Sequence, residues 1–364
     1  MKMTQTYISA LILVTINTSA FASQYNVGSN SQHLTIDGNV ELNFNYRNRE
    51  SNIDYDDEFN QDGRVLIEFA GSKNTPNGHY IGFKAQPLFR STGSVSVDDV
   101  YLNFGQQNGW SIKVGRYEAY DLFPVGLDVF LEYSGDTSNN LYMGESAYIY
   151  QLKEARGRGG DGQIMYSQSV DSFYFEVSSI IGDRSEFFND SYHGVEVDKD
   201  TSKDSFIIRP AIAYQFHDFT IAAGLEQNLI KNAIVDLEGK DISDRTGYGL
   251  TLNWSIENLE ANTNFAHMQA VDETNSSIGV NMLYHRFGIG YVHAENTYDS
   301  SWAKGDVSVG TLYSSFGIND FLSIPDFTVL LGTYFTSVRN RTSNQDAFSE
   351  DDDFGARVRL HYQF

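Results

Sequence analysis

Cysteine, positive charge and long hydrophobic runs are missing or scarce in this sequence. The absence of cysteine excludes a disulfide framework, thiol catalysis and cysteine-ligated zinc or iron–sulfur sites. Lysine and arginine total 25 against 48 aspartate and glutamate residues, which gives a formal net charge of −23. This balance argues against nucleic-acid binding, which needs clustered cations, and against peripheral attachment to anionic lipid. Beyond the N-terminus there is no apolar run of about 20 residues, the length that a membrane-spanning helix requires.

Aromatic residues and glycine are abundant instead, with 25 Phe, 23 Tyr and 31 Gly but only 5 Pro. So many aromatic side chains must be buried somewhere, which argues against a disordered chain. A length of 364 residues allows two or three domains, but this composition favours one large all-β unit.

The first 22 residues have the features of a signal peptide. Lys2 supplies a basic start, Tyr7–Ile16 is mostly apolar, and Ala20-Phe21-Ala22 is a small-residue cleavage site. The apolar part is too short for a membrane anchor, which needs about 20 residues. The sequence therefore predicts export, with removal of residues 1–22 and a single domain over residues 23–364.

Apolar and polar residues alternate strictly over long stretches. From Leu34 to Arg47 every second residue is apolar or glycine and the others are polar, and Phe354–Phe364 repeats the pattern. A period of two indicates β-strands with one apolar and one polar face. The predicted strands, about sixteen, are 33–47, 64–71, 78–86, 95–104, 110–116, 160–168, 172–180, 205–216, 219–228, 245–256, 259–268, 276–284, 287–295, 304–315, 326–337 and 353–364.

Strand length and the connections between strands point to a membrane. Soluble strands usually run about 5 to 6 residues, whereas roughly 9 to 11 tilted residues cross a bilayer. His217-Asp218, Glu257-Asn258 and His285-Arg286 are two-residue joints, and the connections at the other strand ends are expected to be long and acidic. The fold class is therefore all-β: a transmembrane antiparallel β-barrel of about sixteen strands with a water-filled lumen. A soluble sandwich or propeller would have to explain why one face of nearly every strand is polar.

The stretch from Tyr117 to Gln163 does not alternate, and residues 127–137 within it read LDVFLEYSGDT. Here the sequence resembles the Gram-negative trimeric outer-membrane porins, whose third loop folds into the barrel and narrows the pore. The positions that match their loop pattern D-V-x-P-E-F-G-G-D-T are Asp128, Val129, Glu132, Gly135, Asp136 and Thr137. The positions that depart from it are Leu131, Tyr133 and Ser134. The resemblance covers about residues 33–145, and Gly115–Asp121 is similar to the raffinose-porin type of glycoporin.

The resemblance implies an inward-folded constriction loop, at about residues 117–159, whose carboxylates face cations on the barrel wall. The acidic candidates are Asp128, Glu132, Asp136, Asp121 and Glu145. The basic candidates on the pore wall are Arg64, Lys84, Arg116, Arg156, Arg158, Arg357 and Arg359. Where the family has further wall arginines this chain has Val97 or Asp98, and Glu145, so the aperture is more acidic. Charge of one sign in a narrow low-dielectric pore concentrates the opposite ion, and we expect a preference for cations.

Aromatic residues of the same loop are candidates for stacking on sugar rings. They are Tyr117, Tyr120, Phe123, Phe130, Tyr133 and Tyr142. The alternative is that they only pin the loop to the inner wall. Three functions therefore stay open: a passive channel that prefers oligosaccharides, a non-specific diffusion porin for ions and nutrients, and a non-conducting surface barrel that serves as adhesin or phage receptor.

No enzyme, cofactor or metal site is expected. Gly144–Tyr148 begins like a nucleophile elbow, but Tyr148 replaces the second glycine. The C-terminal residues Tyr362 and Phe364 look like the assembly signal of outer-membrane barrels. The partners implied are outer-membrane lipid and lipopolysaccharide, the barrel-assembly machinery, small hydrophilic solutes, and two further copies in a homotrimer. The expected location is the outer membrane of a Gram-negative bacterium.

Overall fold

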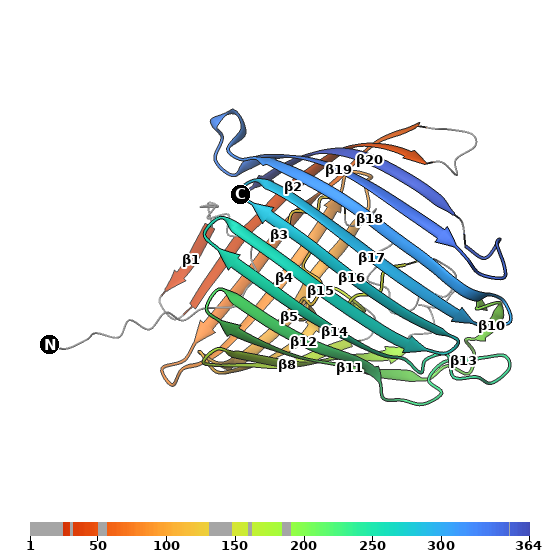
Figure 1. The fold of residues 1–364 in the computed structure, drawn as a ribbon. Coiled ribbons are helices and arrows are strands. Elements are labelled where there is room, and N and C mark those ends of the chain that lie inside the picture. Colours follow the sequence, from red (N-terminus) through yellow and green to blue (C-terminus); the bar gives the residue numbers. More distant parts are fainter. Residues whose placement is uncertain are drawn as a thin grey trace.

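Sixteen antiparallel strands close into a tilted barrel (Figure 1). The structure is a computed structural model that describes residues 25–29, 32–49, 57–130, 148–158, 162–183, 191–348 and 350–364. The barrel strands are β2 (Gln32–Arg49), β3 (Asp57–Asn74), β4 (His79–Arg90), β5 (Val95–Gln106), β6 (Trp110–Arg116), β7 (Gly162–Val170), β8 (Phe173–Asp183), β11 (Asp204–Phe216), β12 (Phe219–Asn228), β14 (Thr246–Ile256), β15 (Leu259–Ala270), β16 (Glu273–Tyr284), β17 (Phe287–Asp299), β18 (Lys304–Ile318), β19 (Phe327–Asn340) and β20 (Asp351–Gln363). The predicted fold class is confirmed.

The first and last barrel strands pair with each other, which closes the sheet. β2 and β20 run antiparallel from Asn39 opposite Gln363 to Arg49 opposite Asp353. Gly38 and Phe364 exchange two backbone hydrogen bonds of 3.0 Å at the end of this ladder. The additional strand β1 (Tyr25–Ser29) pairs with the start of β2, on the edge that β20 leaves uncovered. The backbone groups of β2 are therefore paired along its length, as a lipid environment requires.

Side chains alternate between an apolar outer surface and a polar interior. On β2, Phe44 is 52% exposed, whereas its neighbours Asn43 and Asn45 are each 6% exposed. The same alternation on the other strands leaves an apolar band of Leu, Ile, Val and aromatic side chains outside. Lipid favours this arrangement because it covers the outer face while water and polar side chains fill the inside. In the part of the chain that the structure describes, no helix is long and apolar enough to cross a membrane.

Two-residue turns join several strands at one end of the barrel, as predicted. Each begins with a residue of positive φ, namely His217 at 51°, Glu257 at 49° and His285 at 55°. Positive φ at this position matches the twist of the flanking strands in tight hairpins. Phe219 and Trp254 stack at this end with ring centroids 6.0 Å apart, beside these turns. Such aromatic pairs form the girdle that outer-membrane barrels place at the lipid–water boundary.

The opposite end differs from the prediction in three respects. β3 begins at Asp57, so residues 57–63 belong to a strand and not to a loop. The alternation of apolar and polar residues does not reveal this extension, because a strand that protrudes beyond the lipid needs no apolar outer face. The turns at 91–94 and 271–272 are short, against the expectation of long connections at this end. Finally, β9 (Ser191–Tyr192), β10 (Val195–Asp198) and β13 (Val235–Asp236) form a small separate sheet at this mouth, far from β1 (Figure 1).

Candidate functional site

The non-alternating segment between β6 and β7 is here called the lumen loop (residues 117–158), and its described parts lie inside the barrel. Residues 117–130 and 148–158 are described, and side chains of the wall donate hydrogen bonds to their backbone carbonyls. These bonds are Thr251 to Leu122 at 2.6 Å, Asn264 to Pro124 at 3.2 Å, Asn281 to Pro124 at 2.6 Å, Tyr313 to Val125 at 2.8 Å, and Asn296 to Tyr148 at 2.9 Å. The donors belong to β14, β15, β16, β17 and β18, so the loop is fixed along one side of the interior. The predicted inward fold of the loop is confirmed.

Glycines on the wall make room for the loop. A Cβ atom at Gly332 would lie 2.3 Å from Cγ2 of Val129, and one at Gly288 would lie 2.7 Å from Cβ of Leu127. Both distances are shorter than carbon atoms allow, so the loop packs only against a wall without side chains there. Sequence reasoning missed this signal, which is visible as glycine at inward positions of β17 and β19.

Arg156 and Arg357, both predicted to line the pore wall, are buried and hold the loop; Arg156 belongs to the lumen loop and not to the wall. Arg156 is 2% exposed, and Nε lies 3.0 Å from Oε2 of Glu226 on β12. Arg209 on β11 donates to the backbone oxygens of Lys153 and Arg156, at 3.1 and 3.2 Å. Arg357 on β20 is also 2% exposed and donates to the carbonyl of Val129. Burying an ion pair removes the hydration of both charges, and separating the partners leaves each charge buried without compensation. These contacts therefore stabilise the loop in one position.

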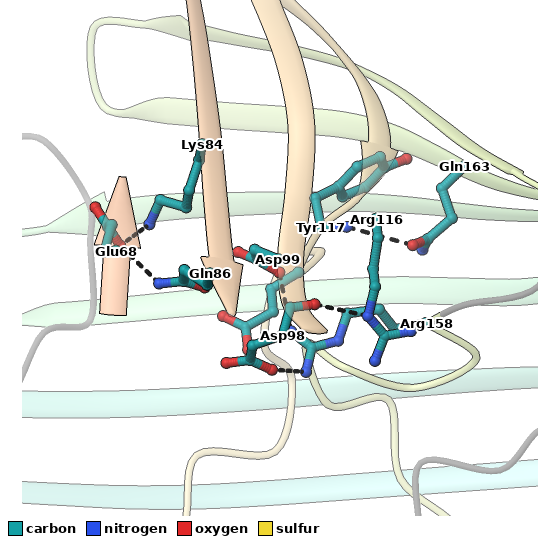
Figure 2. Close-up of polar contacts among 10 residues, drawn as sticks. Glu68, Lys84, Gln86, Asp98, Asp99, Arg116, Tyr117, Arg158 and Gln163 are labelled. Atoms are coloured by element: carbon teal, nitrogen blue, oxygen red, sulfur yellow. Dashed lines mark hydrogen bonds and ion pairs between the residues drawn. The ribbon is translucent and has the colours of Figure 1, made fainter. Parts of the chain in front are cut away.

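The opposite wall, formed by β2 to β6, carries ion pairs that face the interior. Lys84 lies 2.8 Å from Glu68, to which Gln86 also donates at 2.6 Å (Figure 2). Arg64 lies 3.0 Å from Glu41. These groups are partly exposed rather than buried, with 26% of the Lys84 side chain accessible. This wall, here called the charged wall, therefore offers alternating donors and acceptors to a solute in the lumen.

The return end of the lumen loop joins the charged wall through Arg158. Its guanidinium lies 2.5 Å from Asp98, 2.9 Å from Asp99 and 3.1 Å from Glu118. Figure 2 shows Arg158 beside Arg116, which donates to the backbone carbonyl of Asp98 at 2.6 Å. Counting the pairs of Arg64, Lys84 and Arg158, three cations meet five carboxylates on this side of the lumen.

Glu118 is a loop carboxylate with a raised pKa. Burial raises its pKa, with a further rise from the nearby Glu154 carboxylate, to about 7. Arg158 acts in the opposite direction but does not compensate. Since 46% of the Glu118 side chain is accessible, the raised pKa reflects the loop and wall on its buried side together with the nearby carboxylates. The pKa of Asp121 is raised as well, by burial and by Glu154.

The remaining predicted residues occupy varied positions. Asp128 accepts a hydrogen bond from the Phe130 backbone at 2.7 Å, and Arg359 donates to Asn43 at 2.7 Å. The aromatic candidates Tyr117, Phe123 and Phe130 are buried against the wall, whereas Tyr120 is half-buried. The candidates that lie outside the described residues are Glu132, Tyr133, Asp136, Tyr142 and Glu145.

Three inward residues of β6 and β8 were missed by sequence reasoning. Lys113 lies over the ring of Tyr101, with Nζ 4.9 Å from the centroid, and Tyr174 and Glu176 contact the lumen loop. The alternation rule could have found them, because all three share the inward face of their strands. The residues that the structure describes contain no group of three or more acidic or histidine side chains placed to hold a metal.

A closed sixteen-stranded barrel with a polar interior and an inward-folded loop defines the class of outer-membrane porins. The model of the family described as porin-like glycoporin RafY matches residues 24–364, and the chain belongs to this family. It is an outer-membrane diffusion channel of a Gram-negative bacterium.

Solved porin structures share the fold at low sequence identity. OmpF of Salmonella typhi, solved in complex with daunomycin, superposes with a TM-score of 0.60 at 13% identity, covering 93% of this chain and 100% of that one. An anion-selective porin from Comamonas acidovorans gives 0.59 at 13% identity, covering 92% and 100%. OmpT, an outer membrane protein of Vibrio cholerae, gives 0.58 at 13% identity, covering 93% and 100%. No curated protein sequence matches the chain.

Proposed function

We propose that the channel prefers oligosaccharides and that it favours cations over anions among small ions. The observation that carries the sugar preference is the charged wall facing the tethered lumen loop. Its ion pairs, such as Lys84 with Glu68, present donors and acceptors close together while largely cancelling each other's field. A neutral polyhydroxylated solute can exchange its water for such groups without a net electrostatic cost.

The preference for cations rests on the excess of carboxylates. In the ion pairs of Arg64, Lys84 and Arg158 three cations meet five carboxylates. Lys113 and Arg116 of β6 offset part of this excess, and Asp128, Glu132 and Asp136 of the loop would add to the negative side. A narrow pore with this charge raises the local concentration of cations. We further propose that the chain acts as a passive pore, in keeping with its porin family.

Export and assembly complete the proposal. Residues 1–22 would be removed as a signal peptide, leaving residues 23–364 as the barrel domain. Tyr362 and Phe364 would be read by the assembly machinery, and three copies would associate in a membrane whose outer leaflet contains lipopolysaccharide. Deleting Phe364 should then lower the amount of folded protein in the outer membrane more than the amount synthesised.

Planar-bilayer recording tests the proposed function. A steady conductance that raffinose reduces in a saturable way supports the sugar preference. A steady conductance that raffinose leaves unchanged would favour non-specific diffusion. A barrel without conductance would instead be a surface adhesin or phage receptor.

A further inference from the structure

A stacked pair of tyrosine rings joins the lumen loop to the barrel wall. Tyr120 of the loop and Tyr174 of β8 have ring centroids 5.5 Å apart and an interplanar angle of 29°. Both rings lie at the edge of a buried cluster that includes Leu122, Tyr150 and Met268. Both are half-buried, so part of each ring remains accessible. Among the predicted stacking residues that the structure describes, Tyr117, Phe123 and Phe130 are buried, whereas Tyr120 keeps accessible surface.

One buried carboxylate, that of Glu176, is hydrogen-bonded to both tyrosines. Oε1 of Glu176 accepts a hydrogen bond from the Tyr120 backbone amide at 2.7 Å, and Oε2 accepts one from the Tyr174 hydroxyl at 2.6 Å. Glu176 is only 3% exposed, so these bonds are shielded from competing water. The Tyr174 ring and the Tyr120 backbone are therefore held before any solute arrives, and the Tyr120 ring stacks on the fixed Tyr174 ring, which lowers the cost of binding to them.

Polar groups surround the ring pair. The Tyr174 hydroxyl donates to Glu176, Ser167 on β7 lies near the Tyr174 side chain, and Lys113 on β6 lies near Glu176. An apolar surface bordered by a few fixed polar groups is the usual composition of a small-molecule site. Pyranose rings have such complementary surfaces, with an apolar C–H face and hydroxyl groups at the edge.

We infer that Tyr120 and Tyr174 form a stacking subsite for one pyranose ring of an oligosaccharide in transit. The inference rests on the proposed function and specifies where the sugar binds. Tyr174 is the second residue of β8 and follows the short turn at 171–172, so the subsite lies toward the short-turn end of the lumen. A ring bound there has passed the charged wall at Lys84 and Asp99 and is close to leaving the pore.

The chain provides a matched control for this subsite. Phe173 of β8 and Tyr214 of β11 form a similar ring pair, with centroids 4.5 Å apart and an angle of 32°, at the neighbouring position of β8. Because neighbouring residues of a strand point to opposite faces, this second pair lies on the outer surface. A solute in the lumen has no access to Tyr214.

Raffinose block of the current in planar bilayers gives the test, with the trimer or monomer as it is purified. Tyr174→Leu and Tyr120→Leu should each weaken the apparent binding of raffinose by roughly 3- to 10-fold, the range expected for loss of one aromatic contact. Tyr174→Phe retains the ring and should keep most of the affinity. Tyr214→Leu should bind raffinose as the unaltered protein does.

Each contrary outcome has a distinct meaning. If raffinose blocks the unaltered channel and both leucine variants equally, the subsite is wrong while the proposed function stands. The subsite is also wrong if Tyr174→Phe loses as much affinity as Tyr174→Leu, or if Tyr214→Leu loses as much. If raffinose does not block the unaltered channel, the proposed function and the subsite fail together.

Discussion

The two sides of the barrel interior use polar residues for different purposes. On the side of β14 to β18, amide and hydroxyl side chains such as Asn281 and Thr251 donate hydrogen bonds to the backbone carbonyls of the lumen loop. On the side of β2 to β6, polar side chains pair with each other across the strands and remain partly exposed, as Lys84 and Glu68 do. One side of the barrel therefore anchors the loop, and we propose that a solute moves along the other.

Breaking the anchor should have the largest effect. Glu226→Gln would leave Arg156 and Arg209 buried without their carboxylate, which costs about 3–5 kcal/mol in comparable pairs. We expect a lower urea midpoint of barrel unfolding and a larger, fluctuating single-channel conductance as the loop leaves the wall. A variant with an unchanged midpoint and an unchanged, steady conductance would show that this ion pair does not hold the loop.

Neutralising the loop acids should have an intermediate effect, on the ion selectivity of the pore. Asp128→Asn combined with Glu132→Gln removes negative charge from the constriction, so the ratio of cation to anion permeability should fall several-fold. The reversal potential in a salt gradient measures this ratio. A reversal potential equal to that of the unaltered channel would show that these two residues do not determine ion selectivity.

Acidification should act in the same direction through Glu118, but more weakly. Since its pKa is raised to about 7, the carboxylate is mostly charged at pH 8 and mostly neutral at pH 6. Protonation removes a negative charge from the lumen, so selectivity for cations should decrease as the pH falls through 7. Reversal potentials recorded at both pH values check this expectation, and Glu118→Gln should reduce the difference. An equally large pH effect in Glu118→Gln would assign the titration to another group.

The smallest effect is expected outside the lumen. Lys304 and Asp299 form an ion pair in which each side chain is 74% exposed, at the long-loop end of the barrel. Exposed pairs contribute little because water and salt screen them. Lys304→Ala should therefore match the unaltered protein in urea midpoint and conductance, and it serves as the control for Glu226→Gln. A large loss of stability in Lys304→Ala would show that burial does not decide how much an ion pair contributes to the stability of this barrel.

The fold was more accessible to sequence reasoning than the site was. Alternation identifies the barrel strands because lipid and water act on each residue separately, so the pattern is local. The burial of Arg156 and Arg357 depends on Glu226 and on the carbonyl of Val129, which lie far away in the chain. No local pattern distinguishes an arginine that lines a pore from one that anchors a loop. Alternation could have placed Tyr174 on the inward face of its strand, but not its stacking on Tyr120, which belongs to a different element.

Cysteine accessibility tests the contrast between the two sides most directly, because the chain has no cysteine of its own. Lys84→Cys places a thiol on the charged wall, and Ser277→Cys places one under the loop, where Ser277 is 3% exposed and bonded to the Tyr150 carbonyl. A charged, water-soluble thiol reagent should reduce the current of Lys84→Cys rapidly and leave that of Ser277→Cys unchanged. Equal modification at both positions, or faster modification at Ser277→Cys, would contradict the placement of the solute path along β2 to β6.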